Sequence, residues 1–315
     1  MMQQAAPNPN ANPNPHYGPH RYEVRHRTTY RYDADVNVSL ARAILRTRPT
    51  SYQQVSDEVI EIDPEPTLIE QHVDFFGNLS HYVEIRTPHQ VLDVYKRCVA
   101  EVDMPLQDLS ELRISVADAV DALQDDPDVD ATEVGIFTLP SDLVSLAPVV
   151  QEFAATLLWP KRPLGEAIAD VYRTIFRDFK YDKHATNVRT TLPEVIVKQA
   201  GVCQDFAHLA IACFRAVGLP ARYVSGYIET YPPLGKPKLA GSDATHAWAS
   251  VLVPGKGWVD LDPTNNHLAD SRYITSAWGR DFSDVSPLKG VIFSESKHSE
   301  LKVGVDVSRL DTPQT

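Results

Sequence analysis

The sequence lacks both a long apolar run and a basic, apolar N-terminus. No stretch reaches the roughly 18 consecutive apolar residues of a membrane-spanning helix. The chain begins Met1-Met2-Gln3-Gln4 and continues with Ala, Pro and Asn, which does not fit a secretory signal peptide. Hydrophobic residues still make up 43% of its 315 residues, a composition typical of a globular protein with a packed core. We expect a cytoplasmic protein with no membrane partner.

Cysteine is scarce, with only Cys98, Cys203 and Cys213 in the whole chain. An odd and low count does not support a disulfide framework. Cys203, His208 and Cys213 follow one another at intervals of five, which turns each about 140° away from the last on a helix, so they would not converge on zinc. No Asp-x-Asp-x-Asp-Gly calcium loop is present either. We expect free thiols, no metal and no cofactor, with Cys98 and Cys213 in the core.

Basic residues are outnumbered, with 30 Lys and Arg against 42 Asp and Glu and a formal net charge of −12. Nucleic acid is excluded as the main partner, because phosphate contacts need clustered basic side chains. The segment from Glu101 to Glu133 holds eleven acidic residues and one basic residue, Arg113. A charge block of this kind is typical of a solvated surface.

The length and the changes of pattern along the chain indicate more than one domain. Residues 1–20, rich in Pro and Asn, are expected to form a disordered tail. From Arg21 on, apolar and polar residues alternate as in a half-buried strand. We predict an antiparallel β domain over 21–102, an acidic helical connector over 103–163 and a catalytic core over 164–315.

Periodicity within the predicted core favours a helical layer followed by strands. Helices are predicted at 164–178 and 192–199, and a central helix from Cys203 to Val217. Gly201 precedes this helix and Gly218-Leu219-Pro220 ends it. The strands that follow are predicted at 221–229, 246–253, 257–261, 272–276, 290–294 and 301–307. Helices packed on an antiparallel sheet define an α+β fold.

The central helix begins at a cysteine, which indicates nucleophilic chemistry. The unpaired N–H groups of a helix N-terminus favour a thiolate, and the Cys203 amide is also suited to an oxyanion hole. His246 could act as the base, and Asp262 could orient it. Asp260 lies two residues earlier on the same strand face and competes with Asp262 for this role.

Four motifs give this arrangement its specificity and resemble the transglutaminase-like superfamily over about 164–268. They are Gly201-Val202-Cys203-Gln204-Asp205-Phe206-Ala207-His208, Gly218-Leu219-Pro220-Ala221-Arg222-Tyr223-Val224-Ser225-Gly226-Tyr227, Thr245-His246-Ala247-Trp248 and Gly257-Trp258-Val259-Asp260-Leu261-Asp262-Pro263-Thr264. The resemblance implies a papain-like α+β fold with Cys203 as nucleophile, His246 as base and Asp262 as orienting acid. The N-terminal region is similar to the β domain that precedes this core in bacterial members.

Side chains around the predicted triad receive other roles. The family's oxyanion tryptophan has Trp159 as its nearest upstream candidate here, with Tyr181 as a substitute. His208 is expected to pack rather than to catalyse. Asp205 and Arg222 are expected to form a structural ion pair.

These observations predict a thiol hydrolase acting on peptide or isopeptide bonds of a protein or peptide substrate. The alternatives are a protein-glutamine γ-glutamyltransferase, in which an amine replaces water, and a catalytically silent scaffold of the same fold. The oligomeric state stays open.

Overall fold

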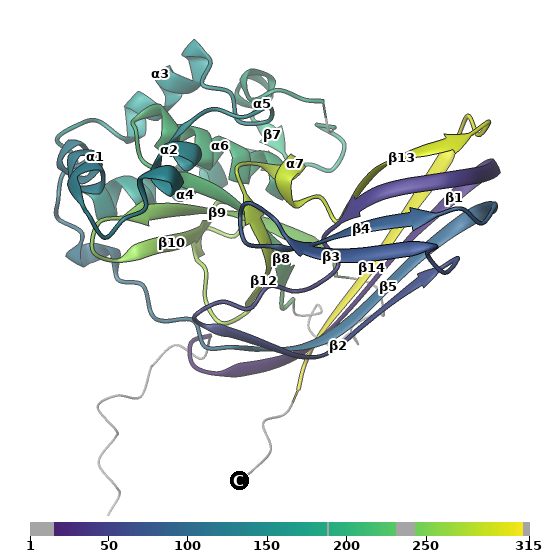
Figure 1. Ribbon diagram of the computed structural model, residues 1–315. Helices are drawn as coiled ribbons and strands as arrows, with labels where there is room; N and C mark the ends of the chain where they lie inside the picture. The colour runs from purple at the N-terminus through teal and green to yellow at the C-terminus, as the bar shows by residue number, and fades with distance from the viewer. Residues whose placement is uncertain (1–15, 188, 231–242, 311–315) are drawn as a thin grey trace, which may run out of the picture.

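Two antiparallel sheets and a layer of helices make up the part of the chain that the structure describes. The computed structural model describes residues 16–187, 189–230 and 243–310. Figure 1 shows the helices gathered over one sheet and the longer strands of the other sheet extending away from them. This arrangement confirms the predicted α+β class and the antiparallel N-terminal sheet. Of the predicted disordered tail, residues 1–15 lie outside the described residues.

The N-terminal sheet is built around one strand of 24 residues, β1. Tyr22, Val24 and His26 are buried along its first half while Arg25 and Arg27 are exposed, as the alternating sequence predicts. The strands run in the order β2-β5-β1-β4-β3, with β13 and β14 also paired to β1. Their bounds are β1 His20–Ala43, β2 Gln53–Asp63, β3 Leu68–Val73, β4 Leu79–Ile85, β5 His89–Val102, β13 Leu288–Ser294 and β14 Ser299–Arg309.

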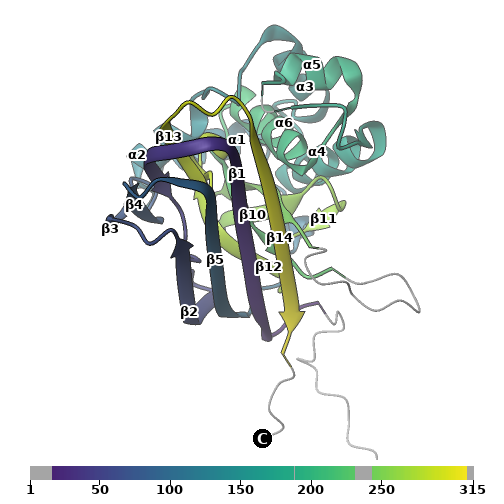
Figure 2. The ribbon, with the colours of Figure 1, turned by 90° about the vertical axis from the view of Figure 1, so that its right-hand side faces the viewer.

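The last two strands belong to this sheet, although they follow the strands of the second sheet in sequence. β14 pairs with β1 from Tyr22↔Arg309 to Tyr32↔Ser299, and β13 pairs with the second half of β1. Figure 2 shows β14, β1 and β5 side by side. The sheet is therefore assembled from both ends of the described chain.

The second sheet has the order β11-β10-β9-β8-β12, and the central helix packs on β9 and β8. Its strands are β8 Ala221–Ile228, β9 Thr245–Val253, β10 Gly257–Asp262, β11 His267–Leu268 and β12 Tyr273–Gly279. The helices are η1 Leu109–Glu111, α1 Val116–Asp125, α2 Ala131–Thr138, α3 Pro148–Leu157, α4 Leu164–Asp178, α5 Leu192–Lys198, α6 Cys203–Ala216 and α7 Phe282–Val285. A short parallel pair, β6 Lys180–Tyr181 and β7 Ala200–Gly201, lies just before α6.

The helix ends follow local capping rules. α6 ends at Ala216, and Gly218 just beyond it has a φ of 88°, which a residue with a side chain rarely adopts. Within the predicted helical connector, α3 begins at Pro148, because proline fits the first helical turn. α2, which the sequence reasoning missed, is capped by the Asp130 side chain on the Thr132 amide.

The hydrophobic core is split by the second sheet. Residues of β9 at odd positions, such as Ala247 and Ala249, pack against the helices with Leu209 of α6. The opposite face, represented by Trp248, packs against Tyr22 and Val24 of β1. The helices of the predicted connector join the first of these clusters through side chains that include Val116, Ala119, Leu123, Val150 and Ala154. The N-terminal sheet therefore covers the face of the core sheet that the helices leave free.

Candidate active site

The N-terminus of α6 places Cys203 at the first position of a buried helix. Asp205, in the first turn, accepts a hydrogen bond from the Val202 amide at 2.8 Å and another from the Thr186 hydroxyl at 2.6 Å. This carboxylate satisfies one of the amides that a helix start leaves unpaired. A Cβ on Gly201 would lie 2.7 Å from an Asp205 oxygen, so glycine is needed for this close approach. The Cys203 side chain is partly exposed.

His246 and Asp262 come together from neighbouring antiparallel strands. His246 is the second residue of β9, and Asp262 is the last residue of β10. The His246 Nε2 atom lies 2.7 Å from Asp262 Oδ2. The Asp262 side chain is fully buried and that of His246 is 9% exposed. Since Nε2 faces the carboxylate, Nδ1 is the nitrogen left for the sulfur.

Five hydrogen bonds hold the Asp262 carboxylate. Its Oδ1 accepts the amides of Thr264 and Asn265 at 2.7 and 3.2 Å. Its Oδ2 accepts the Asn265 amide group at 2.7 Å, the Tyr273 hydroxyl at 2.6 Å and His246. The sequence reasoning missed Asn265 and Tyr273. Asn265 carries a signal, because Asp-Pro-Thr-Asn is a turn sequence in which an aspartate side chain binds following amides.

Opposite charges decide the protonation of this buried pair. Burial alone would lower the pKa of His246, but the Asp262 carboxylate outweighs it and raises this pKa to about 10, and Cys203 acts in the same direction. Burial would likewise raise the pKa of Asp262, but His246, Tyr273 and Asn265 bring it down to about 2. At neutral pH the pair is therefore an imidazolium and a carboxylate. The contribution of Cys203 places its sulfur within interaction distance of the imidazole.

Asp262, and not Asp260, contacts the imidazole. Asp260 Oδ2 accepts a hydrogen bond from Trp248 Nε1 at 3.0 Å. The Trp248 ring in turn stacks beside the His246 ring, with centroids 6.2 Å apart. Asp260 thus fixes an aromatic neighbour of His246, and the two aspartates share a strand face with different partners.

Tyr181 lies beside the start of α6, whereas Trp159 lies near its other end. Tyr181 pairs with Gly201 in the β6–β7 ladder. Burial and then the charges of Cys203 and Asp205 raise the pKa of Tyr181, which places it near the sulfur. Trp159 lines a surface hollow with Ala216 and other residues at the far end of a helix of 14 residues, about 20 Å away. Trp159 is therefore too far from Cys203 to contact a group bound there.

His208 and the two other cysteines, which the sequence analysis assigned to packing, are buried. His208 is buried, and its Nε2 accepts the Phe282 amide at 3.2 Å, as a packing histidine would. Cys98 and Cys213 are buried, as predicted.

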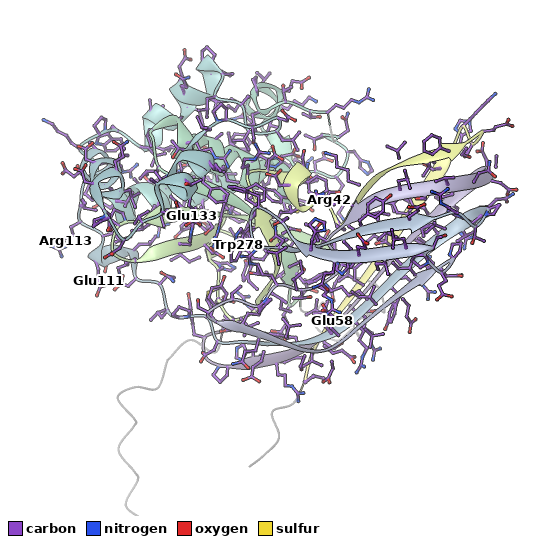
Figure 3. The ribbon with its side chains drawn as sticks, viewed as in Figure 1. Arg42, Glu58, Glu111, Arg113, Glu133 and Trp278 are labelled. Carbon is purple, nitrogen blue, oxygen red and sulfur yellow. The ribbon has the colours of Figure 1, made fainter. Side chains whose placement is uncertain are left out.

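The predicted ion pair between Asp205 and Arg222 is wrong. Arg222 lies on the face of β8 that is turned away from α6. Its guanidinium is 4.1 Å from the Trp258 ring centroid and 3.8 Å from that of Trp278. Asp205 instead binds the start of α6, because the unpaired amides there attract its carboxylate. Figure 3 shows Trp278 between the helical half and the N-terminal sheet.

Within the described ranges, no group of three or more His, Cys, Asp or Glu side chains is arranged to hold a metal ion. Nor does any described helix combine the length and the apolar character that crossing a membrane requires.

Comparison with known families agrees with the fold. Residues 151–263 match the model of the transglutaminase-like superfamily. Residues 22–101 match the bacterial transglutaminase-like N-terminal region. The chain belongs to this superfamily and carries the N-terminal domain of its bacterial members.

Individual proteins resemble this chain over different shares of its length. The uncharacterized protein Rv2569c of Mycobacterium tuberculosis is 42% identical over 299 residues, which cover 91% of this chain and 92% of that protein. A crystal structure from Cytophaga hutchinsonii, described as a "Putative Cysteine Protease", superposes with a TM-score of 0.72 at 21% identity and covers 94% of this chain and 93% of its own, so the fold is shared. A protein-glutamine gamma-glutamyltransferase of Pseudomonas aeruginosa is 36% identical over 67 residues, 21% of this chain and 10% of that protein.

Proposed function

We propose that this protein is a thiol hydrolase that cleaves peptide or isopeptide amide bonds, with Cys203, His246 and Asp262 as its catalytic residues. The observation that carries the proposal is the buried His246–Asp262 contact of 2.7 Å beside the cysteine at the start of α6. An imidazolium beside a sulfur at a helix N-terminus favours the reactive thiolate. In keeping with a free thiol, we propose that the protein works in the cytoplasm.

The reaction follows from these positions. The Cys203 thiolate attacks the carbonyl carbon, a C–S bond forms, and the carbonyl oxygen takes the negative charge. The Cys203 amide is a donor for that oxygen, and the Tyr181 hydroxyl is the side chain best placed to be a second donor. His246 gives its proton to the leaving amine as the C–N bond breaks. Water, deprotonated by His246, then attacks the thioester and releases the acid.

Two observations bear on whether water or an amine accepts the acyl group, that is, on whether the reaction is hydrolysis or transamidation. Cys203 is partly exposed, so water can reach a thioester formed there. An amine competes with water only where the cleft excludes water. The local similarity to a protein-glutamine gamma-glutamyltransferase favours the alternative, in which a primary amine takes the acyl group.

Intact-protein mass spectrometry of the wild type and Cys203→Ala, each incubated with a peptide library and a primary-amine probe, separates the candidates. We expect an acyl adduct on the wild type alone and its release by water. Amine incorporation into a glutamine peptide would instead identify a transamidase. Neither adduct nor turnover in the wild type would contradict the enzymatic proposal and support the scaffold alternative.

A further inference from the structure

A cavity of about 480 Å³ lies where the N-terminal sheet, the helical connector and the core sheet meet. Tyr52 lines it from just before β2, Glu133 from α2 and Arg222 from β8. Glu133 and Trp278, two of the lining residues, are labelled in Figure 3. The volume of the cavity is typical of a site for a small molecule.

This cavity is distinct from the candidate active site. Arg222 of β8 pairs with Ser250 of β9, whereas Gly226 pairs with His246, so the two levels are about 13 Å apart along the strands. Arg222 also lies on the face of β8 that is turned away from α6, the helix that begins at Cys203. A ligand in the cavity would therefore lie across the core sheet from the helix that carries the candidate nucleophile.

Arg222 is a buried cation whose N–H groups have no acceptor. It is 5% exposed, and its Nε is buried with no hydrogen-bond partner among the described residues. Nor does its guanidinium form an ion pair with a described carboxylate. It lies over the rings of Trp258 and Trp278, 4.1 and 3.8 Å from their centroids, and these contacts use ring faces, which leaves its N–H donors unpaired. A carboxylate in the cavity would supply the planar acceptor that these donors lack.

Burial has a measurable consequence for this guanidinium. It lowers the pKa of Arg222, while Asp260, Tyr52 and Glu133 act in the opposite direction. The nearby carboxylates therefore offset part of the cost of burying the charge without bonding to it. A bound anion would add the direct hydrogen bonds.

Asp260 is an acidic group on the same sheet face as Arg222. Arg222, Ser250 and Asp260 lie side by side on β8, β9 and β10, so the first and the last are about 10 Å apart between Cα atoms. Asp260 is 6% exposed. Its Oδ2 accepts Trp248 Nε1 at 3.0 Å and lies 3.5 Å from the Tyr52 hydroxyl, whereas its Oδ1 accepts no hydrogen bond from the described residues. Oδ1 is thus available to an ammonium group.

The other two charged residues of the lining are less buried and already have partners. Lys256 Nζ lies 2.8 Å from Glu111 Oε2. Glu133 Oε1 accepts Trp258 Nε1 at 3.3 Å. Arg222 and Asp260 are therefore the buried charges that a ligand would meet, one of each sign.

Apolar side chains form most of the remaining walls, and the cavity opens to solvent. The apolar and aromatic lining residues are Tyr52, Met104, Pro105, Trp258, Ala269 and Trp278. Ser51 and Gly257, also in the lining, are exposed. A ligand that fits these surroundings carries a carboxylate, an ammonium and an apolar part.

We propose that this cavity binds a free α-amino acid with an apolar side chain, with its carboxylate on Arg222 and its ammonium on Asp260. A zwitterion offsets both buried charges, whereas a simple anion or amine offsets only one of them. The apolar side chain packs against the aromatic walls. The site is separate from the proposed function and does not depend on Cys203.

Molecules that differ by one charged group test the proposal. L-Phenylalanine carries both charges, 3-phenylpropanoate lacks the ammonium and 2-phenylethylamine lacks the carboxylate. L-Leucine, 4-methylpentanoate and 3-methylbutylamine form the matched aliphatic series. Affinity is measured by saturation-transfer NMR titration of the full chain. We expect at least one of the two amino acids to bind with a Kd on the order of 1 mM or lower, and its two analogues to bind at least about tenfold more weakly. No binding of either amino acid, or equal binding of its analogues, would overturn the proposal.

Two substitutions assign the two charges of the ligand. Arg222→Met should weaken binding of the amino acid and of the carboxylate analogue, and leave the amine analogue unchanged. Asp260→Asn should weaken binding of the amino acid and of the amine analogue, and leave the carboxylate analogue unchanged. Arg113→Met is the matched control, because Arg113 is exposed and lies outside the lining, and it should bind all three as the wild type does.

A folded Arg222→Met protein that bound the carboxylates with wild-type affinity would contradict the assignment. Arg222→Lys is the second variant if the methionine variant does not fold. It keeps the positive charge but loses the planar pair of donors, so it should bind both carboxylate ligands more weakly than the wild type.

Cys203→Ala separates this proposal from the proposed function. The variant should bind the amino acid as the wild type does, because the cavity lies across the core sheet from α6. Binding that was lost with Cys203 would place the amino acid in the candidate active site and reject a second site. A wild type that bound the amino acid but formed no acyl adduct would reject only the proposed function.

Discussion

His246 and His26 are both buried on sheet faces, yet their surroundings give them opposite charge states. Near His246 the closest charge is the Asp262 carboxylate, which raises the histidine pKa to about 10 against the effect of burial. Near His26, burial and the Lys96 ammonium both lower the pKa, to about 4. Burial acts in the same direction at both sites, so the sign of the neighbouring charge decides the outcome. The candidate site thus holds an imidazolium, whereas the sheet junction holds a neutral imidazole beside the Lys96 ammonium.

The largest expected effect comes from removing the charge that distinguishes His246. Asp262→Asn keeps the shape of the side chain but takes away the negative charge, so the imidazolium is lost and the ring is free to adopt the wrong tautomer. We expect kcat to fall on the order of 10³- to 10⁴-fold, measured with the peptide identified by mass spectrometry.

Asp260→Asn is the matched control for this substitution, because it makes the same change on the same strand face. Asp260 bonds Trp248 and not the imidazole. We expect a loss of less than about tenfold. If the two asparagine variants were equally slow, the orienting role would not belong to Asp262 alone.

The two histidines should also stabilise the fold on opposite sides of neutrality. His26 has a folded pKa of about 4, below its ordinary 6.5, so its contribution is full above pH 6.5 and is lost as the pH falls toward 4. Between pH 6.5 and 4 the free energy of unfolding of the wild type should therefore fall, and we call this part of the stability curve its acid limb. We expect the fall to be smaller by about 3 kcal/mol in His26→Gln, measured as the free energy of urea unfolding at each pH.

His246→Gln should change the alkaline limb of the same stability curve, between pH 6.5 and 10. The folded pKa of His246 lies above 6.5, so its contribution is full below pH 6.5 and is lost as the pH rises toward 10. The alkaline limb should therefore be flatter in this variant, while the acid limb between pH 6.5 and 4 keeps the slope of the wild type. Stability curves that stayed parallel to the wild type in both variants would contradict the opposite charge states.

The smallest effect is expected from Tyr273→Phe. The substitution removes one of five hydrogen bonds to Asp262 and leaves the contact with His246 in place. We expect kcat to fall by no more than about tenfold and the free energy of unfolding to fall by about 1.5 kcal/mol. Both are measured under the conditions used for Asp262→Asn. A loss as large as that of Asp262→Asn would show that Tyr273 does more than hold the carboxylate.

Local patterns in the sequence were sufficient for part of this site. A cysteine after a glycine and before an apolar run predicts a helix start, and period-2 alternation predicts the strands that carry His246 and Asp262. The structure brings His246 and Asp262 into contact. The choice between Asp260 and Asp262 needed the register of β10 against β9, which a strand pattern alone does not contain.

Long-range pairing explains what the sequence reasoning could not predict. Tyr273 reaches Asp262 from β12, whose only sheet neighbour in the described chain is β8, so no spacing in the sequence links them. His26 and Lys96 face each other because β1 and β5 pair in one particular register. The last two strands were predicted as strands, but their partner was not, since pairing with β1 joins residues 245 to 287 positions apart.

The pairing of β14 with β1 also affects how the protein is made. Val24 lies opposite Val307, so β1 leaves the ribosome well before β14, the strand with which it pairs. The helical half and the core sheet, whose contacts are closer in sequence, can fold during this interval. Until β14 has left the ribosome, one edge of β1 stays open and exposes unpaired backbone groups, which leaves it available for pairing with other strands.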